Sequence, residues 1–177
     1  MSSLNLLLTQ TYAMDILNEM KSDHEHMSFP VEIIDAQDFL KLDMKLIKFI
    51  CSRIISDAGF REGHLGVVIG DNVIIQELNN RYLVHDCETD VLSFCLERFK
   101  THLEGDIIIS TEEAIRRHTE FGLSAISEAM LYVIHGVLHM VGYDDDTPTN
   151  KKLMRQMEAK YLKMIGIDPT EDGPTAR

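Results

Sequence analysis

Apolar positions along the chain alternate between short runs and longer stretches with helical spacing. The short runs predict strands at residues 30–34, 65–69, 91–96 and 106–109. The longer stretches predict helices at residues 38–58, 71–82, 124–141 and 147–165, with a further helix that starts at residue 110. Because strands and helices alternate early in the chain, the pattern predicts a single α/β (α+β) domain with a small mixed sheet of about four strands covered by helices.

Residues that commonly begin and end helices support these boundaries. Gly59 fits the end of the first helix, and Asp71 fits the cap of the second. The helix at 124–141 starts with a serine and is apolar on nearly every face, so we expect it to be buried. The helix at 38–58 is predicted to turn these residues toward the core: Phe39, Leu42, Leu46, Phe49, Ile50 and Ile54.

Two histidines lie one helical turn apart in the buried helix. His135 and His139 are separated by four positions, so their side chains lie about 40° apart around the helix and about 6 Å apart along it. Both rings can therefore reach one metal ion. The turn that follows contains Asp144, Asp145 and Asp146. We expect the third ligand to come from this turn, and spacing alone leaves open which carboxylate points inward.

Two imidazoles and a carboxylate, with a fourth position left for water, form a known catalytic arrangement for zinc. An ion of this kind lowers the pKa of bound water. The alternative is a pair of hydrogen-bonded core histidines, which the spacing and the acidic turn disfavour. The pair also differs from the His-Glu-x-x-His motif of zinc proteases, because Gly136 stands where that motif has its general base. A metalloprotease or other metal hydrolase is therefore a less favoured interpretation.

The charge of the chain argues against a nucleic-acid partner. A net charge of −12 repels a phosphate backbone, whereas nucleic-acid binders usually carry a basic face. A nuclease can still hold its substrate locally, through a metal and a few cations. We consider Arg116, Arg117 and His118 as such cations. The cations at 151–163 instead fit the solvated side of an amphipathic helix.

Other features of the composition concern the compartment. The chain is 45% hydrophobic but has no run of eighteen apolar residues, so we expect no membrane association. Its three cysteines lack Cys-x-x-Cys spacing, which favours reduced thiols. The N-terminus lacks the basic and apolar regions of an export signal. We therefore expect a cytoplasmic protein.

Three segments of the chain together resemble a known family. They are the His-Gly-x-x-His-x-x-Gly-Tyr-Asp run at 135–144, the Leu-Asn to Thr-Asp-Val-Leu-Ser-Phe segment at 78–94, and the strand at 105–110. In this order they are similar to the signature segments of the YbeY family. Members of that family are bacterial metal-dependent endoribonucleases implicated in rRNA maturation and ribosome quality control.

The resemblance implies a single-strand-specific endoribonuclease that binds one Zn²⁺ or another divalent ion. The implied ligands are His135, His139 and Asp145, at one end of the buried helix. The implied partners are single-stranded RNA, ribosomal RNA and components of the small ribosomal subunit. We accordingly expect an N-terminal extension at 1–29 with a short helix and a polar linker, a domain at 30–166 and a C-terminal tail at 167–177.

Two positions depart from the family pattern. Asp145 stands where the family has a third histidine; a carboxylate makes the ion less electrophilic and also suits manganese or magnesium. Leu83 stands where the family has an arginine. Arg81 can take the role of that arginine only if the backbone there is not a regular helix, because residues i and i+2 face apart; otherwise it is a solvated charge. The alternative function is a non-catalytic ribosome-assembly factor with a degenerate metal site.

Overall fold

A mixed four-stranded sheet forms the centre of the protein, as the sequence predicts. The structure is a computed structural model that describes residues 29–82 and 89–169. The strands are β1 (Val31–Asp35), β2 (Glu62–Gly70), β3 (Val91–Phe99) and β4 (His102–Ser110). They lie in the order β1-β2-β4-β3. β1, β2 and β4 run parallel, and β3 pairs antiparallel with β4 in a hairpin.

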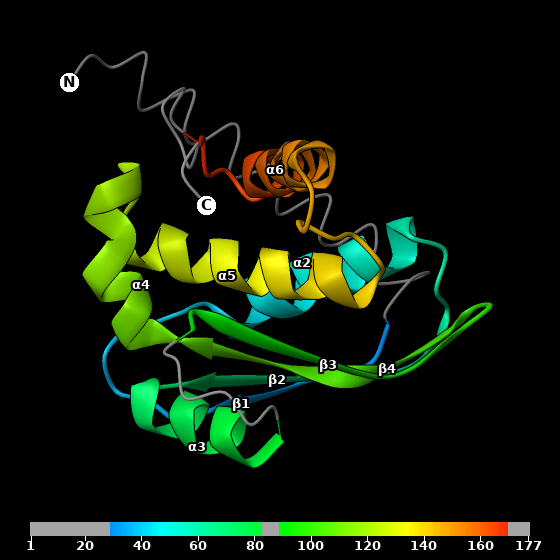
Figure 1. Cartoon of the computed structure of the whole chain (residues 1–177), viewed down its shortest axis with the longest axis horizontal. Coiled ribbons are helices and arrows are strands. Elements are labelled where there is room, and N and C mark those ends of the chain that lie inside the picture. The colour runs from blue at the N-terminus through cyan, green and yellow to red at the C-terminus, as the bar shows by residue number, and fades with distance from the viewer. Residues whose placement is uncertain (1–28, 83–88, 170–177) are drawn as a thin grey trace.

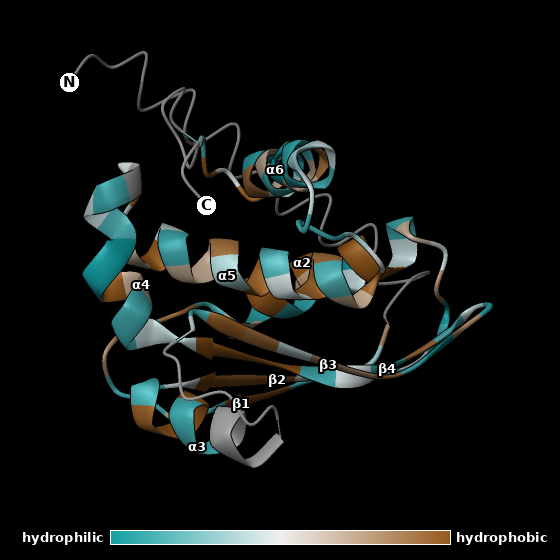
Figure 2. Cartoon of the chain, viewed as in Figure 1, coloured by the Kyte–Doolittle hydropathy of each residue, from teal (hydrophilic) through white to brown (hydrophobic). Residues whose placement is uncertain are grey.

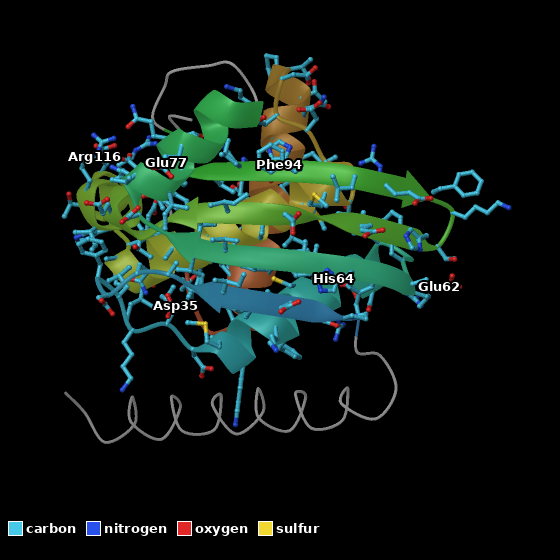
Figure 3. The ribbon with its side chains drawn as sticks, turned by 90° about the horizontal axis from the view of Figure 1, so that it is seen from below. Asp35, Glu62, His64, Glu77, Phe94 and Arg116 are labelled. Atoms are coloured by element: carbon cyan, nitrogen blue, oxygen red, sulfur yellow. The ribbon has the colours of Figure 1, made fainter. Side chains whose placement is uncertain are left out.

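The helices cover the two faces of the sheet unequally. One face packs against α2 (Met44–Asp57) and α5 (Ala125–Met140), flanked by α4 (Thr111–Arg117), and a short 3₁₀ turn (His118–Phe121) joins α4 to α5. α6 (Pro148–Met164) lies on the outer side of α5 (Figure 1). Of the helices in the described part of the chain, only α3 (Asn72–Tyr82) lies on the opposite face, where polar side chains such as His64 are seen beside it (Figure 3).

The distribution of apolar residues explains this layering. The main core lies between the sheet and the α2–α5 layer, where the strands and the inner helices are most hydrophobic (Figure 2). Only a small cluster of Ile75, Leu92 and Ile108 lies under α3. α5 is buried almost along its whole length, because its residues are apolar on the sides that face the sheet, α2 and α6.

The first helix is shorter at its start than the sequence pattern predicts. α2 begins at Met44, because the Asp43 side chain accepts hydrogen bonds from the backbone N–H groups of Lys45 and Leu46. The preceding residues form a turn in which the Gln37 side chain accepts from two backbone N–H groups. Phe39 therefore lies outside the helix and is 53% exposed, so its predicted place on the buried side is wrong.

The β3–β4 hairpin is longer than the two predicted strands. β3 continues to Phe99 and β4 starts at His102, although most of the residues by which they exceed the predicted strands are polar. Hairpin pairing satisfies their backbone groups, so these residues need no apolar neighbours to remain extended. The other predicted helices agree with the structure within a few residues: Asp71 caps α3, Ser110 caps α4, Ser124 caps α5 and Thr147 caps α6.

Several predictions concern segments outside the described residues. These are the N-terminal helix and linker and most of the C-terminal tail. Within the described part of the chain, no single helix is long and apolar enough to cross a membrane. One bent pair, Thr111–Glu120 with Ala125–Met140, would satisfy the length and composition criteria.

Gly136 allows α5 to lie close to β3, and this contact predicts the effect of a mutation. A Cβ atom at Gly136 would lie 2.9 Å from Cγ2 of Val91 and 3.2 Å from Oγ of Ser93. Alanine favours a helix by about 1 kcal/mol over glycine, but overpacking a tight core costs about 1–3 kcal/mol. We expect Gly136→Ala to lower the free energy of unfolding by about 1 kcal/mol, measured by urea denaturation.

The exposed residue Ile126 on the same helix provides the control for this measurement. Ile126 is 47% exposed, so Ile126→Ala should change the free energy of unfolding by no more than about 0.5 kcal/mol. A Gly136→Ala protein as stable as wild type would show that the close approach of α5 to β3 is not a constraint.

Candidate metal centre

The two histidines lie in the last turns of α5, and the chain folds back over them. α5 ends at Met140, and Gly142 adopts the left-handed backbone (φ 105°) that reverses the chain. The Tyr143 N–H donates to the Leu138 carbonyl at 2.9 Å, which closes the turn. This reversal returns the acidic residues after Tyr143 to the side of the helix that carries the two imidazoles.

Each imidazole is oriented by an acceptor at its Nδ1 atom. His135 Nδ1 lies 2.6 Å from Oε1 of Glu158 on α6, and His139 Nδ1 lies 3.1 Å from the carbonyl oxygen of Tyr143. A carbonyl oxygen and an ionised carboxylate can only accept a hydrogen bond, so both rings donate from Nδ1. In the neutral rings, Nε2 therefore carries the lone pair.

The two Nε2 atoms face each other at 2.9 Å, and the ring planes meet at 82°. Two nitrogen lone pairs at this separation repel each other unless a proton or a metal cation lies between them. Zinc–nitrogen bonds are about 2.0–2.1 Å long, so one ion can contact both atoms. The donor set thus fits a divalent metal.

The electrostatic environment favours a neutral His139 ring. Burial, and then the neighbouring His135, lower the pKa of His139, and this outweighs the opposing effects of Asp145 and Asp144. A lowered pKa disfavours a proton as the cation between the two rings. Exposure increases outward across the site: 13% for the His135 side chain, 27% for His139 and 38% for Asp145. The cluster is therefore open to solvent on the side of Asp145.

Of the three aspartates in the turn, Asp145 lies nearest to the imidazoles. One of its carboxylate oxygens is 3.8 Å from Nε2 of His139. One donor atom each from His135, His139 and Asp145 lie within 4.8 Å of one another. Asp144 instead accepts the backbone N–H of Asp145, and Asp146 accepts from the Asn150 side chain. The structure thus brings together the three residues that the sequence analysis selected.

Glu158 is the site residue that sequence reasoning missed. It is buried on the face of α6 that also carries Met154, Tyr161 and Leu162. A carboxylate on the apolar stripe of an amphipathic helix is a recognisable signal, because a buried charge needs a partner. The partner could not be identified from spacing, since His135 is 23 positions away on another helix.

Contacts with α2 hold α6, and therefore Glu158, in position. The Tyr161 hydroxyl donates to Asp57 at the end of α2 at 3.1 Å, and the Lys160 ammonium donates to the same oxygen at 3.2 Å. Burial raises the pKa of Asp57, but these two hydrogen bonds and the charge of Arg53 together lower it below its usual value. The ionised carboxylate of Asp57 thus joins the end of α2 to Lys160 and Tyr161 of α6.

The other predicted cations lie away from the imidazoles. Arg116 pairs with Glu113, and Arg117 pairs with Asp90 and Glu120. Both arginines belong to α4, beyond the opposite end of α5 (Figure 1). Arg116 lies at the margin of the sheet (Figure 3). Arg81 belongs to α3, but its side chain is outside the described part of the structure, as is Leu83.

The carboxyl ends of β2 and β4, where α/β sheets usually bind ligands, are filled by the protein itself. β2 leads to α3 on one face and β4 leads to α4 on the other, which is the arrangement that opens a crevice. Here the Asn72 backbone N–H donates to Glu112, and the Asn72 side chain bonds to Ser110 and Glu113. These contacts occupy the crevice, so the metal centre at the far end of α5 is the better candidate site.

Comparison with known proteins identifies relatives of the whole domain. The model of the family described as endoribonuclease YbeY matches residues 30–166. An endoribonuclease YbeY from Salinibacter ruber is 34% identical over 144 residues, which cover 77% of this chain and 92% of that protein. Its counterpart from Carboxydothermus hydrogenoformans is 35% identical, with 77% and 98% covered. The solution structure of a Thermotoga maritima protein aligns with a TM-score of 0.54 and 26% identity, covering 76% of this chain and 88% of that one.

The bond between Glu158 and His135 predicts a test of metal binding. Groups that hold a metal-binding histidine in orientation typically contribute about 10–100-fold to metal affinity. We expect Glu158→Gln to weaken Zn²⁺ binding by about tenfold or more, measured by competition with a chromophoric chelator. Glu77→Gln removes an exposed carboxylate on α3 and should leave the affinity unchanged. Equal affinity in Glu158→Gln and wild type would contradict the role of Glu158.

Proposed function

The chain belongs to the YbeY endoribonuclease family, and on this basis we propose that it cleaves single-stranded RNA with one divalent metal ion held by His135, His139 and Asp145. The observation that carries the proposal is the opposed pair of Nε2 atoms, each on a ring whose Nδ1 hydrogen has an acceptor. We expect the ion to be Zn²⁺, and the carboxylate of Asp145 also suits manganese or magnesium.

The roles of the residues follow from their contacts. A bound divalent ion supplies Lewis acidity for water and for the phosphate oxygens. Glu158 and the Tyr143 carbonyl keep both imidazoles in one tautomer, so no reorganisation is needed when the ion binds. Asp145 is the most exposed of the three, so the RNA strand would enter beside it. Arg81 remains our proposal for a catalytic cation; because Arg81 is part of α3, this role requires that the chain leave the helix after Tyr82.

We further propose that the substrate is ribosomal RNA and that the protein acts in rRNA maturation and ribosome quality control in the cytoplasm, with small-subunit components as partners. The family relationship supports an RNA substrate. The net charge of −12 requires that binding depend on local contacts rather than on a long-range attraction.

The family departures favour one second candidate, a ribosome-assembly factor without catalysis. Leu83 stands where the family has a cationic arginine. The negative charge of Asp145 reduces the positive charge that a bound ion can offer to phosphate. The two candidates differ in metal content and cleavage. The position of Gly136 also argues against a metalloprotease, because Gly136 faces β3 and a glutamate there would meet Val91 and Ser93.

Substitution of His139 tests the proposed function. We expect His139→Ala to lose metal and to cleave RNA at least about 100-fold more slowly, because one of three ligands is gone. Elemental analysis and a gel assay with single-stranded RNA measure the two effects. His64→Ala removes a histidine from the face of the sheet that carries α3 and should retain both properties. RNA cleavage that survives either His139→Ala or chelation would contradict a metal-dependent mechanism.

Substitution of Asp145 by histidine tests the third ligand. Three neutral imidazoles leave the bound ion more electrophilic than two imidazoles and a carboxylate do. We therefore expect Asp145→His to retain zinc and to shift the rising limb of the pH–rate profile for RNA cleavage toward lower pH. Asp144→Asn, a change at the neighbouring carboxylate, should leave the profile in place. An unchanged profile in Asp145→His would indicate that Asp145 is not a ligand.

A further inference from the structure

The β3–β4 hairpin projects beyond the helices at the end of the molecule where α5 ends (Figure 1). Its last cross-strand pair is Phe99 with His102, and the intervening turn contains Lys100 and Thr101. The carbonyl oxygen of Thr101 accepts the backbone N–H groups of Arg61 and Glu62, at the start of β2. The tip of the hairpin is therefore anchored to the start of β2.

An irregularity in β3 decides which side chains of the hairpin face α5. Cys95 pairs with Gly105, but the next pair is Glu97 with Glu104, so Leu96 is an extra residue in the strand. Side chains alternate along a strand, and one extra residue exchanges the two faces. The bulge therefore places Arg98, opposite the buried Leu103, on the side of α5 and leaves Glu97 on the other side.

The guanidinium of Arg98 lies against the turn that carries the metal centre. Nη1 is 3.4 Å from the carbonyl oxygen of Met140, and it would be 2.8 Å from a Cβ atom at Gly142. Gly142 lies between His139 and Asp145 in the sequence. Arg98 is exposed, and among the described residues no carboxylate lies within ion-pair distance of it. Its other N–H donors are thus open to a phosphate.

The next residue, Phe99, belongs to the opposite face of the hairpin. It pairs with His102 and lies on the same side of β3 as Glu97, because side chains alternate along a strand. The Phe99 side chain is 61% exposed, and the Lys100 ammonium lies 5.0 Å from the centre of its ring. Arg98 is therefore the cation of this segment that faces α5.

We propose that Arg98 binds a phosphate of the RNA strand next to the metal centre. This inference rests on the proposed RNA-cleaving function, and cations that contact the backbone are one of the features by which proteins bind single-stranded nucleic acid. Glu97 and Glu104 lie on the other face of the hairpin with His102 between them, and their charges repel a strand from that face. The strand therefore runs on the side of α5, toward Asp145.

One substitution with two controls tests this subsite. Arg98→Gln removes the proposed contact. Lys48→Gln removes an exposed charge on α2, and Phe99→Ser removes an exposed aromatic ring from the opposite face of the hairpin. Fluorescence anisotropy with a short single-stranded oligoribonucleotide measures Kd in the His139→Ala background, where cleavage is blocked, and steady-state assays of the same changes in wild type separate KM from kcat.

We expect Arg98→Gln to raise Kd and KM by about fivefold or more, with kcat within about twofold of wild type, because the contact is the same in the ground and transition states. Arg98→Gln should also reduce the slope of log Kd against log salt by about 0.7, the value for one phosphate contact on a single strand. Arg98→Lys should keep the wild-type slope, and Phe99→Ser should leave the slope unchanged.

Other outcomes separate this inference from the proposed function. If wild type cleaves the oligonucleotide but Arg98→Gln matches Lys48→Gln and Phe99→Ser in Kd and KM, the subsite is wrong and the RNA-cleaving function stands. If wild type neither binds nor cleaves the oligonucleotide, both are wrong.

Discussion

The placement of two imidazoles on a helix that is buried nearly everywhere else is the constraint on which the rest of the structure depends. α5 packs against the sheet, α2 and α6, so His135 and His139 can be tolerated only where their ring hydrogens are accepted. Glu158 and the Tyr143 carbonyl supply the two acceptors. Both acceptors depend on the fold: one needs α6 in place, and the other needs the chain reversal after Gly142.

This constraint connects the metal centre to the stability of the domain. Glu158 is buried among apolar side chains of α6, where an unpaired carboxylate would be costly, and its partner is His135. Tyr161 and Lys160, within one turn of Glu158, anchor α6 to Asp57 on α2. On the opposite side, Gly136 allows β3 to approach α5, which brings the hairpin and Arg98 beside the same end of the helix. The site therefore rests on contacts from both layers.

Much of this arrangement is predictable from sequence because it is local. The spacing of His135 and His139, the glycine that ends α5 and the acidic turn all act within one segment, and hydrophobic periodicity predicts the sheet and its helices. Three features are not local. Glu158 and its partner His135 lie on different helices. The first helix starts later than predicted, because the Gln37 side chain accepts a backbone N–H group in the turn before it. The bulge at Leu96 depends on the pairing of β3 with β4. Sequence patterns carry little information on such contacts.

The central claim is that the fold presents two imidazoles with their Nδ1 hydrogens accepted by the protein and their Nε2 atoms directed at one point. Long-range ¹H–¹⁵N correlation NMR of the histidine rings, before and after addition of one equivalent of Zn²⁺, tests it most directly. The account predicts that His135 and His139 carry their hydrogen on Nδ1 near neutral pH, and that zinc changes the chemical shifts of both Nε2 atoms while Nδ1 stays protonated. Hydrogens on Nε2 in the metal-free protein, or Nε2 shifts that do not respond to zinc, would contradict it.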